Sequence, residues 1–340
     1  MRTAIEQEYR DLLLREGFGQ LLEPPSRADT RRFVEQLSTA EREFLGELVD
    51  EYLASDYVEQ YENPYDDVHE QLRKTLGESG LDVLGPVYVG EYPHHAYNAQ
   101  ARRARNGTLI LLNTGLRTLL DRVAVVLSAS ILTVDRQADG SRRTEQATVE
   151  QNRLHEQARA MLAESVVAYV SGGAVDAPSR IRLPITERLA FGFLIMRSAE
   201  KFTVGHEIGH LLAGHLHAPP GAGVSREYEA DELAALLLLR EFTPATPFLT
   251  KAITAAGPFL FLAVDHLVQR VQREVFDLPP ALHHRTHPPS DQRAAVLRGF
   301  FTDYEGPKVL QIADACVSWL SGLEPEIVAT AQRLLRTTWL

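Results

Sequence analysis

Two histidines, His206 and His210, stand four positions apart in this chain, and Glu207 directly follows the first of them. In an α-helix this spacing places the two imidazole rings one turn apart on the same face. Neighbouring residues on the other faces, such as Val204 and Ile208, are apolar. A helix that is apolar on several faces is packed on several sides. The pentapeptide therefore predicts a central, buried helix that carries two adjacent imidazoles.

The sequence from His206 to His210 matches the pattern H-E-x-x-H. Two imidazoles on one helical face can share a zinc ion, and the glutamate between them can act as general base toward a water on that metal. A buried helix with two hydrogen-bonded histidines would show the same five residues. The distinction depends on whether the rest of the chain supplies the other parts of a metal site.

A catalytic zinc generally has three protein ligands and one open position, so a third ligand is expected outside the pentapeptide. His215 and His217 are close in sequence. The metzincin pattern, however, requires a glycine at 213 and a histidine at 216, where this chain has Ala213 and Leu216. That class is excluded. We expect His215 to interact instead with the C-terminus of its own helix, where a donor ring is favoured.

The next helical segment offers better candidates. Glu227 and Asp231 are four positions apart and share a helical face. Glu227 could bind the zinc while Asp231 accepts a hydrogen bond from the second nitrogen of a ligand histidine. Glu229, on another face, is the second candidate for the third ligand. An acidic first helical turn, favoured by the helix dipole, is the alternative explanation of these carboxylates.

A further segment contains His287, Pro288, Pro289 and Arg293. Paired prolines fix the direction of the backbone and so position the residue that precedes them. His287 and Arg293 could both donate hydrogen bonds to an oxyanion. A loop rich in histidine, arginine and proline is also a common neutral feature, so its composition alone does not decide between the two.

The overall composition is that of an ordinary globular protein, with 44% hydrophobic and 24% charged residues. The net charge of −11 argues against a general nucleic-acid or anionic-membrane binder, because both need a basic surface. The single cysteine, Cys316, excludes an intrachain disulfide and a cysteine-rich zinc module, and it fits a reducing compartment. We expect Cys316 to be a core residue.

No signal peptide is expected, since residues 2–10 are charged and no long apolar run follows them. The most apolar stretches, Leu233–Leu239 and Pro258–Val264, are much shorter than the roughly 18 residues of a membrane span. The sequence therefore predicts a cytoplasmic protein without a membrane span. Its oligomeric state is not indicated.

Apolar periodicity and turn residues predict a predominantly α-helical α+β protein with a small antiparallel sheet. Two strands are expected at 87–89 and 109–112, and a helix is expected from Ile185 to about His217 with a possible break near Glu200. The predicted organisation is a helical N-terminal region (1–80), a central domain (81–300) with a helical insertion (about 117–200), and C-terminal helices packed on the core (301–340).

Several elements, taken in order, resemble the gluzincin metalloproteases of the CAAX-prenyl-protease and HtpX type. The similarity spans roughly residues 86–298. It comprises the strand Val87–Gly90, the segment Asn98-Ala99, the strand and helix start Thr108–Leu116, the pentapeptide His206–His210, the segment Glu227–Asp231, and His287-Pro288-Pro289 with Arg293.

This resemblance implies a role for each matched residue. His206, His210 and Glu227 would bind one Zn²⁺ per chain. Glu207 would be the general base and later the acid, and Asp231 would support a ligand. Two further sets would act on the substrate: His287 and Arg293 would stabilise the oxyanion or order the site, and the strand segment at Asn98 and Ala99 would pair with an extended substrate at the sheet edge.

The chain also departs from those relatives. They carry membrane helices, and their second strand is followed closely by the metal helix, whereas here about 90 residues separate Leu116 from His206. Soluble gluzincin-like proteases of bacterial regulatory or phage-exclusion systems are a plausible comparison. We therefore expect a zinc-dependent endopeptidase that cleaves a cytosolic protein. A catalytically silent or zinc-stabilised module that binds a protein in the same groove, and a protease autoinhibited by its extra helices, are the alternatives.

Overall fold

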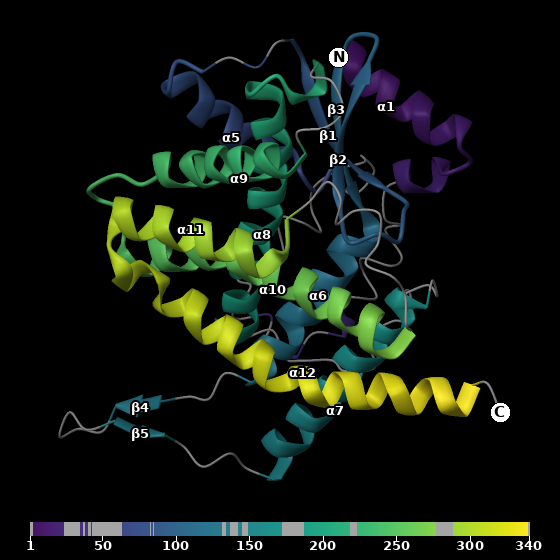
Figure 1. The fold of residues 1–340 in the computed structure, drawn as a ribbon, viewed down its shortest axis with the longest axis vertical. Coiled ribbons are helices and arrows are strands. Elements are labelled where there is room, and N and C mark those ends of the chain that lie inside the picture. Colours follow the sequence, from purple (N-terminus) through teal and green to yellow (C-terminus); the bar gives the residue numbers. More distant parts are fainter. Residues whose placement is uncertain are drawn as a thin grey trace.

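The computed structural model describes most of the chain. The described residues are 3–23, 35–36, 38–39, 42, 63–81, 83, 85–130, 134–136, 142–144, 149–171, 187–217, 223–276 and 288–338. Helices dominate, and a three-stranded sheet lies between the first helix and the others (Figure 1). The predicted fold class, predominantly α-helical α+β, is confirmed.

The elements of the described residues follow in chain order. The helices are α1 (Ala4–Arg15), α5 (Asp66–Glu78), α6 (Thr114–Ser130), α7 (Val149–Val170), α8 (Glu187–Leu212), α9 (Gly223–Arg240), α10 (Phe248–Phe276), α11 (Ser290–Glu305) and α12 (Gln311–Thr338). Short 3₁₀ helices are η1 (Gly19–Leu22), η3 (His215–His217) and η5 (Pro307–Leu310). The strands are β1 (Val87–Tyr92), β2 (Ala99–Ala104), β3 (Gly107–Asn113), β4 (Val134–Arg136) and β5 (Arg142–Thr144).

The main sheet has the strand order β1-β3-β2 and is mixed. The hairpin β2–β3 is antiparallel, whereas β1 and β3 are parallel. The expectation of an antiparallel sheet is therefore wrong for β1. The reason is the connection 93–98, which crosses the end of β3, so that the hairpin returns its second strand in the direction of β1. The backbone of His94 at this crossing accepts hydrogen bonds from Thr114 and Gly115 at the start of α6.

Both faces of β3 are buried, which explains its continuous apolar run. Side chains alternate between the two faces of a strand. Leu109 and Leu111 pack against α1 in one cluster, whereas Ile110 and Leu112 pack against α5 and α8 in another. A strand covered on both sides needs no polar alternation, so the apolar run identifies the central strand.

Strand β2 lies at the edge of the sheet and contacts α8. One of its faces is largely exposed, and Arg102 and Arg103 belong to the strand itself. Its sequence is too polar to be recognised as a strand from apolar periodicity. Because β2 contacts α8, this edge of the sheet lies next to the helix that carries the H-E-x-x-H pentapeptide.

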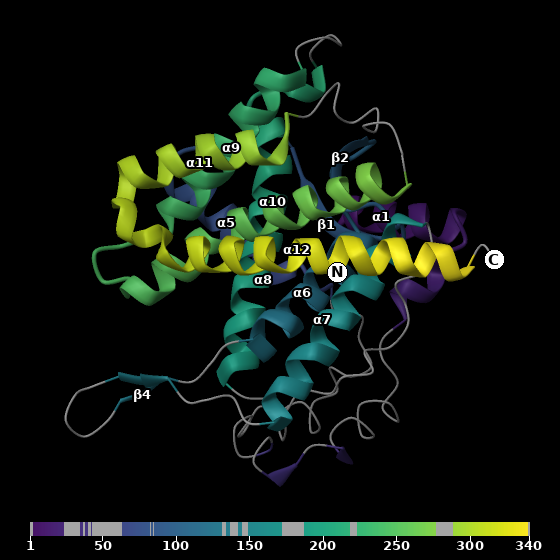
Figure 2. The same ribbon diagram turned by 60° about the horizontal axis from the view of Figure 1, so that its bottom comes forward.

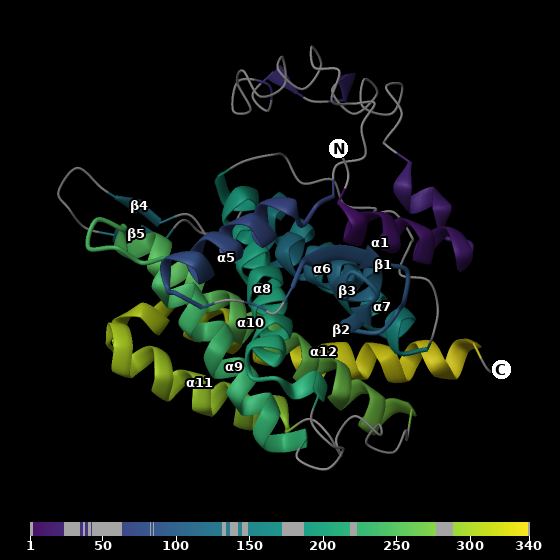
Figure 3. The same cartoon turned by 90° about the horizontal axis from the view of Figure 1, so that it is seen from above.

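Helix α8 is the centre of the helical part (Figures 1 and 3), where it contacts α5, α6, α9 and α10. Every residue from Lys201 to Gly209 is buried. The helix continues without a break past Glu200, and it ends at Leu212 rather than at His217. Gly214 follows with a φ of +70°, a conformation that favours glycine, and turns the chain into η3.

The elements of the structure can be compared with the domain boundaries expected from the sequence. The N-terminal region contributes α1, η1 and α5, and most of residues 24–62 lie outside the described residues. Since α8 runs unbroken through position 200, the expected end of the insertion falls inside a helix. In the C-terminal region α12 packs along α10 and α7 (Figure 2).

Helix α10 extends well beyond the apolar stretch Pro258–Val264, which by itself is too short to span a membrane. Its 29 residues include an 18-residue window with a mean hydropathy of 1.4, so by length and composition it could cross a membrane. However, 61% of this window is buried inside the protein. The central helix of a globular core has the same properties, so this feature is weak support for a span.

Candidate metal centre

Helix α8 directs His206 and His210 toward one point. Their Nε2 atoms lie 3.1 Å apart, and their rings are almost perpendicular, at 85°. His206 is 8% exposed and Glu207 is 7% exposed. The four-residue spacing thus produces the convergence of imidazoles that the sequence predicts, in a place largely protected from water.

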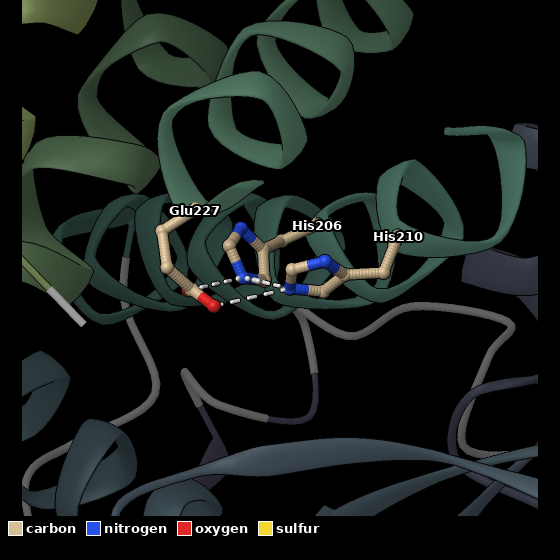
Figure 4. A group of neighbouring side chains, drawn as sticks. All are labelled: His206, His210 and Glu227. Atoms are coloured by element: carbon tan, nitrogen blue, oxygen red, sulfur yellow. Dashed lines mark hydrogen bonds and ion pairs between the residues drawn. The ribbon is translucent and has the colours of Figure 1, made fainter. Parts of the chain in front are cut away.

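Helix α9 brings a carboxylate to the same point (Figure 4). Glu227 Oε2 lies 3.3 Å from His206 Nε2, and Glu227 Oε1 lies 3.5 Å from His210 Nε2. One ligand atom from each of the three residues can be chosen so that all lie within 4.8 Å of one another. This buried group of His206, His210 and Glu227 could hold a metal ion.

One glycine, Gly209, allows α9 to approach α8 this closely. A Cβ added to Gly209 would lie 2.8 Å from the carbonyl oxygen of Ala230, which is closer than real Cβ contacts. A Cβ added to Gly205, one turn earlier, would be 3.4 Å from the Cβ of Ala234, an ordinary contact. The glycine inside the pentapeptide therefore sets the distance between the histidines and Glu227.

A second layer of contacts fixes His206. Its Nδ1 lies 2.9 Å from Asp231 Oδ1, and since a carboxylate only accepts, Nδ1 carries the hydrogen. In the neutral ring the lone pair is then on Nε2, which faces the group. Asp231 itself accepts two hydrogen bonds from the buried guanidinium of Arg293. Arg293 thus holds the carboxylate that contacts the ring of His206.

His210 is fixed by a different chain of contacts. Its Nδ1 lies 2.8 Å from His215 Nδ1, and His215 Nε2 lies 3.1 Å from Glu229 Oε2. Because Glu229 only accepts, His215 in its neutral form carries its hydrogen on Nε2 and accepts at Nδ1. His210 must then donate from Nδ1, which leaves its Nε2 lone pair toward the group. Both histidines are thereby held in the tautomer that a metal needs.

These contacts distinguish Glu227 from Glu229, the two candidates for the third ligand. Glu227 joins the two histidines, whereas Glu229 is bound to His215 and its side chain is 60% exposed. The ring of His215, expected at the end of its helix, lies against His210 in the last turn of α8, where the turn at Gly214 places it.

Hydrogen bonds and neighbouring charges outweigh burial in setting the pKa values of His206 and Asp231. Burial lowers the pKa of His206, but the hydrogen bonds to Asp231 and Glu227 outweigh this effect and raise it to about 9. Burial raises the pKa of Asp231, but the neighbouring charge of Arg293 outweighs it and holds this pKa below the ordinary value of 3.8. The site thus favours a positive charge between His206 and Glu227, either a proton or a metal ion.

Glu207 points from α8 to the edge of the sheet. Its Oε2 accepts a hydrogen bond of 2.6 Å from the backbone N–H of Ala101 in β2. Burial raises the pKa of Glu207 above its ordinary value of 4.5, and the charge of His206 opposes that rise. A carboxylate with a raised pKa is better suited to receive and return a proton near neutral pH.

The remaining predicted site residues lie in different places. Asn98 precedes β2: its side-chain oxygen accepts from the N–H of Ala99, and its carbonyl accepts from the N–H of Asn113. Asn98 therefore secures the start of the edge strand, and Ala99 is the first residue of that strand. His287 lies outside the described residues.

Comparison with known proteins gives no match. No protein-family model, no curated protein and no solved structure corresponds to this chain. The description of the site thus depends on its own geometry.

Two participants were not predicted from the sequence. The sequence indicates His215 only as a ligand or a helix-end residue, and the signal for its role is Gly214, which reverses the chain just before it. Ala101 contributes a backbone N–H, for which no residue type gives a signal. Only the parity of the edge strand, counted from Asn98, shows that this N–H points away from β3.

Proposed function

We propose that this protein is a zinc-dependent endopeptidase that hydrolyses a peptide bond of a protein substrate. The observation that supports it is the spacing of the three donor groups. A tetrahedral ion with bonds of about 2.0–2.1 Å holds its ligand atoms about 3.3–3.4 Å apart. His206 Nε2 and His210 Nε2 lie 3.1 Å apart, while Glu227 Oε2 lies 3.3 Å from the first nitrogen and Glu227 Oε1 lies 3.5 Å from the second.

The donor set also fits zinc chemically. Two imidazoles and one carboxylate are a common catalytic set, which leaves one position for water or substrate. Among the described residues the group has these three members. Iron(II) accepts similar donors, but a buried carboxylate directly beside the first ligand, as in Glu207, is what a hydrolase requires. When bound, zinc would acidify a water molecule and polarise the substrate carbonyl.

The protein residues would perform the other steps. Glu207 would accept a proton from the attacking water and return it to the leaving amine, which its raised pKa favours. His206 and His210 would keep their Nε2 lone pairs on the metal because Asp231 and His215 hold their other nitrogens. Stabilisation of the oxyanion by His287 remains part of this proposal.

The edge of β2 would bind the substrate. Residues 99, 101 and 103 direct their backbone groups away from β3, and the N–H of Ala101 already contacts Glu207. An extended peptide that pairs with this edge of β2 would lie next to Glu207, the proposed general base. We propose a cytosolic protein substrate of the kind cleaved in bacterial regulation or phage exclusion, as the resemblance to gluzincins implies.

The experiment that tests this function compares the wild type with Glu207→Gln in cells. New protein N-termini are identified by mass spectrometry after expression of each form. We expect termini that appear with the wild type, persist with the control Glu229→Gln and disappear with Glu207→Gln. Metal content measured on the same preparations should remain unchanged in Glu207→Gln. Identical termini in all three would contradict the proposal and would favour a module that only binds protein.

A further inference from the structure

A pocket of about 200 Å³ lies between α10, α11 and α12, the helices shown together in Figure 2. One face of α10 lines it at positions 259, 262, 263, 266 and 267, and one face of α12 lines it at 317, 320, 321 and 324. Both sets repeat every three to four residues, as expected for single helical faces. None of the lining residues belongs to the group of His206, His210 and Glu227.

The wall of the pocket is mainly apolar. Phe259, Leu262 and Leu320 belong to the core, and Ala263 and Ala294 are half-buried. An apolar cavity of about 150 Å³ is large enough to hold benzene. The pocket therefore has room for one aromatic ring, or for an aliphatic group of that size, with a few further atoms.

One polar atom in the wall lacks a hydrogen-bond partner. Glu324 is 8% exposed, and its Oε2 accepts a hydrogen bond of 2.9 Å from Arg270 Nη1. Its Oε1 is buried and has no hydrogen-bond partner among the described residues; the nearest ring nitrogen, His266 Nε2, is 3.7 Å away. A buried carboxylate oxygen is an acceptor that requires a donor, so the occupant must supply an N–H or O–H group.

The surrounding charges favour a cationic donor. Arg270 is shared between Glu324 and Glu274, so one guanidinium serves two carboxylates, and the ring of His266, 3.7 Å from Glu324 Oε1, adds a positive charge only when it is protonated. Asp291 adds a third carboxylate at the rim. An anionic ligand would be repelled here, whereas an ammonium group would be attracted and could donate to Glu324 Oε1.

We propose that this pocket binds a small organic amine, with an apolar body about the size of one aromatic ring against α10 and α12 and its ammonium group on Glu324. The site is separate from the metal centre and does not depend on the proposed peptidase activity. Its test is direct binding to the purified protein, so failure of one proposal leaves the other unaffected.

The probe is benzylamine, and its binding to the full chain is measured by isothermal titration and by ligand-observed NMR. For so few atoms we expect a dissociation constant of about 1 mM. Phenylacetate, which has a similar body but the opposite charge, should bind at least about tenfold more weakly. No saturable binding of benzylamine, or equal binding of the two compounds, would overturn the proposal.

Neighbouring alanines of α11 provide matched variants. Ala294→Leu fills the pocket, whereas Ala295→Leu adds the same atoms on an exposed position outside it. We expect the first to weaken benzylamine binding by about tenfold or more and the second to change it by less than about twofold. If Ala294→Leu does not fold, Glu324→Gln serves instead and should weaken binding to a similar extent. Undiminished binding in either pocket variant contradicts the site.

Discussion

Arg293 holds Asp231 by two hydrogen bonds, from Nε to Oδ2 at 2.7 Å and from Nη2 to Oδ1 at 2.6 Å. Asp231 is fully buried and Arg293 is 5% exposed, so each charge depends on the other. This pair connects α11 to α9 and, through Asp231, to the ring of His206. The ring of His206 is therefore held, through Asp231, by a residue that lies 87 positions later in the sequence.

Removal of the arginine should be costly because it leaves a buried carboxylate without its partner. We predict that Arg293→Leu lowers the free energy of unfolding by about 3–5 kcal/mol. Arg298→Leu is the control on the same helix. Arg298 pairs with Asp314 at 2.6 Å, but both side chains are about half exposed, so its loss should cost about 1 kcal/mol or less. Urea denaturation measures both, and equal costs would show that the Arg293 pair is no better than a surface pair.

Gly209 should be required for the distance between α8 and α9. Because the added Cβ would meet the Ala230 backbone at 2.8 Å, Gly209→Ala should separate the helices and destabilise the protein by about 1–3 kcal/mol. Gly205→Ala meets only an ordinary contact and should be neutral or stabilising by up to about 1 kcal/mol, through its higher helix propensity. Thermal unfolding distinguishes the two, and a harmless Gly209→Ala would refute the close approach.

His215 should increase metal affinity without being a ligand. His215→Leu removes the acceptor that fixes the tautomer of His210, and loss of such a support typically lowers metal affinity by about 10–100-fold. His217→Leu, two positions later, removes a ring that contacts Arg103 at the surface and should leave the affinity unchanged. Competition with a chromogenic zinc chelator measures both affinities. The same affinity in the two variants would mean that the contact has no effect on the metal.

Glu200 should make the stability depend on pH. Burial raises the pKa of Glu200 above 4.5, although Arg197, at 2.5 Å, and Arg117 oppose the shift. The folded state therefore holds this proton more tightly than the unfolded chain. The contribution to stability is complete below pH 4.5 and is lost as the pH rises through the folded pKa.

Glu200→Gln removes this dependence. The free energy of unfolding of the variant, relative to wild type, should rise from about pH 4.5 upward, by at most about 1.4 kcal/mol per pH unit. Urea denaturation at a series of pH values measures the difference. Parallel pH profiles for the two proteins would mean that Glu200 has the same pKa in the folded and unfolded states.

The parts that local sequence could predict are those with a fixed spacing. A spacing of four positions from His206 to His210, and from Glu227 to Asp231, places each pair on one helical face whatever the tertiary fold. A continuous apolar run likewise identifies β3, and apolar periodicity identifies helices around it. These properties depend only on the chain within one or two turns.

The parts that could not be predicted depend on residues distant in sequence. The parallel pairing of β1 with β3 results from the path of residues 93–98, and the polar edge strand β2 lacks an apolar pattern. The partner of Arg293 lies 62 positions earlier, at Asp231. His215 occupies its position because Gly214 adopts a positive φ, which the residue type permits but does not require.

The central claim is that His206, His210 and Glu227 hold one zinc ion. Elemental analysis of purified wild type, Glu227→Ala and Glu229→Ala tests it most directly, with circular dichroism to establish that each is folded. We predict one zinc per chain in the wild type and in Glu229→Ala, and its loss in Glu227→Ala. A wild type that neither carries nor takes up zinc, or a Glu227→Ala variant that keeps it while Glu229→Ala does not, would contradict the assignment.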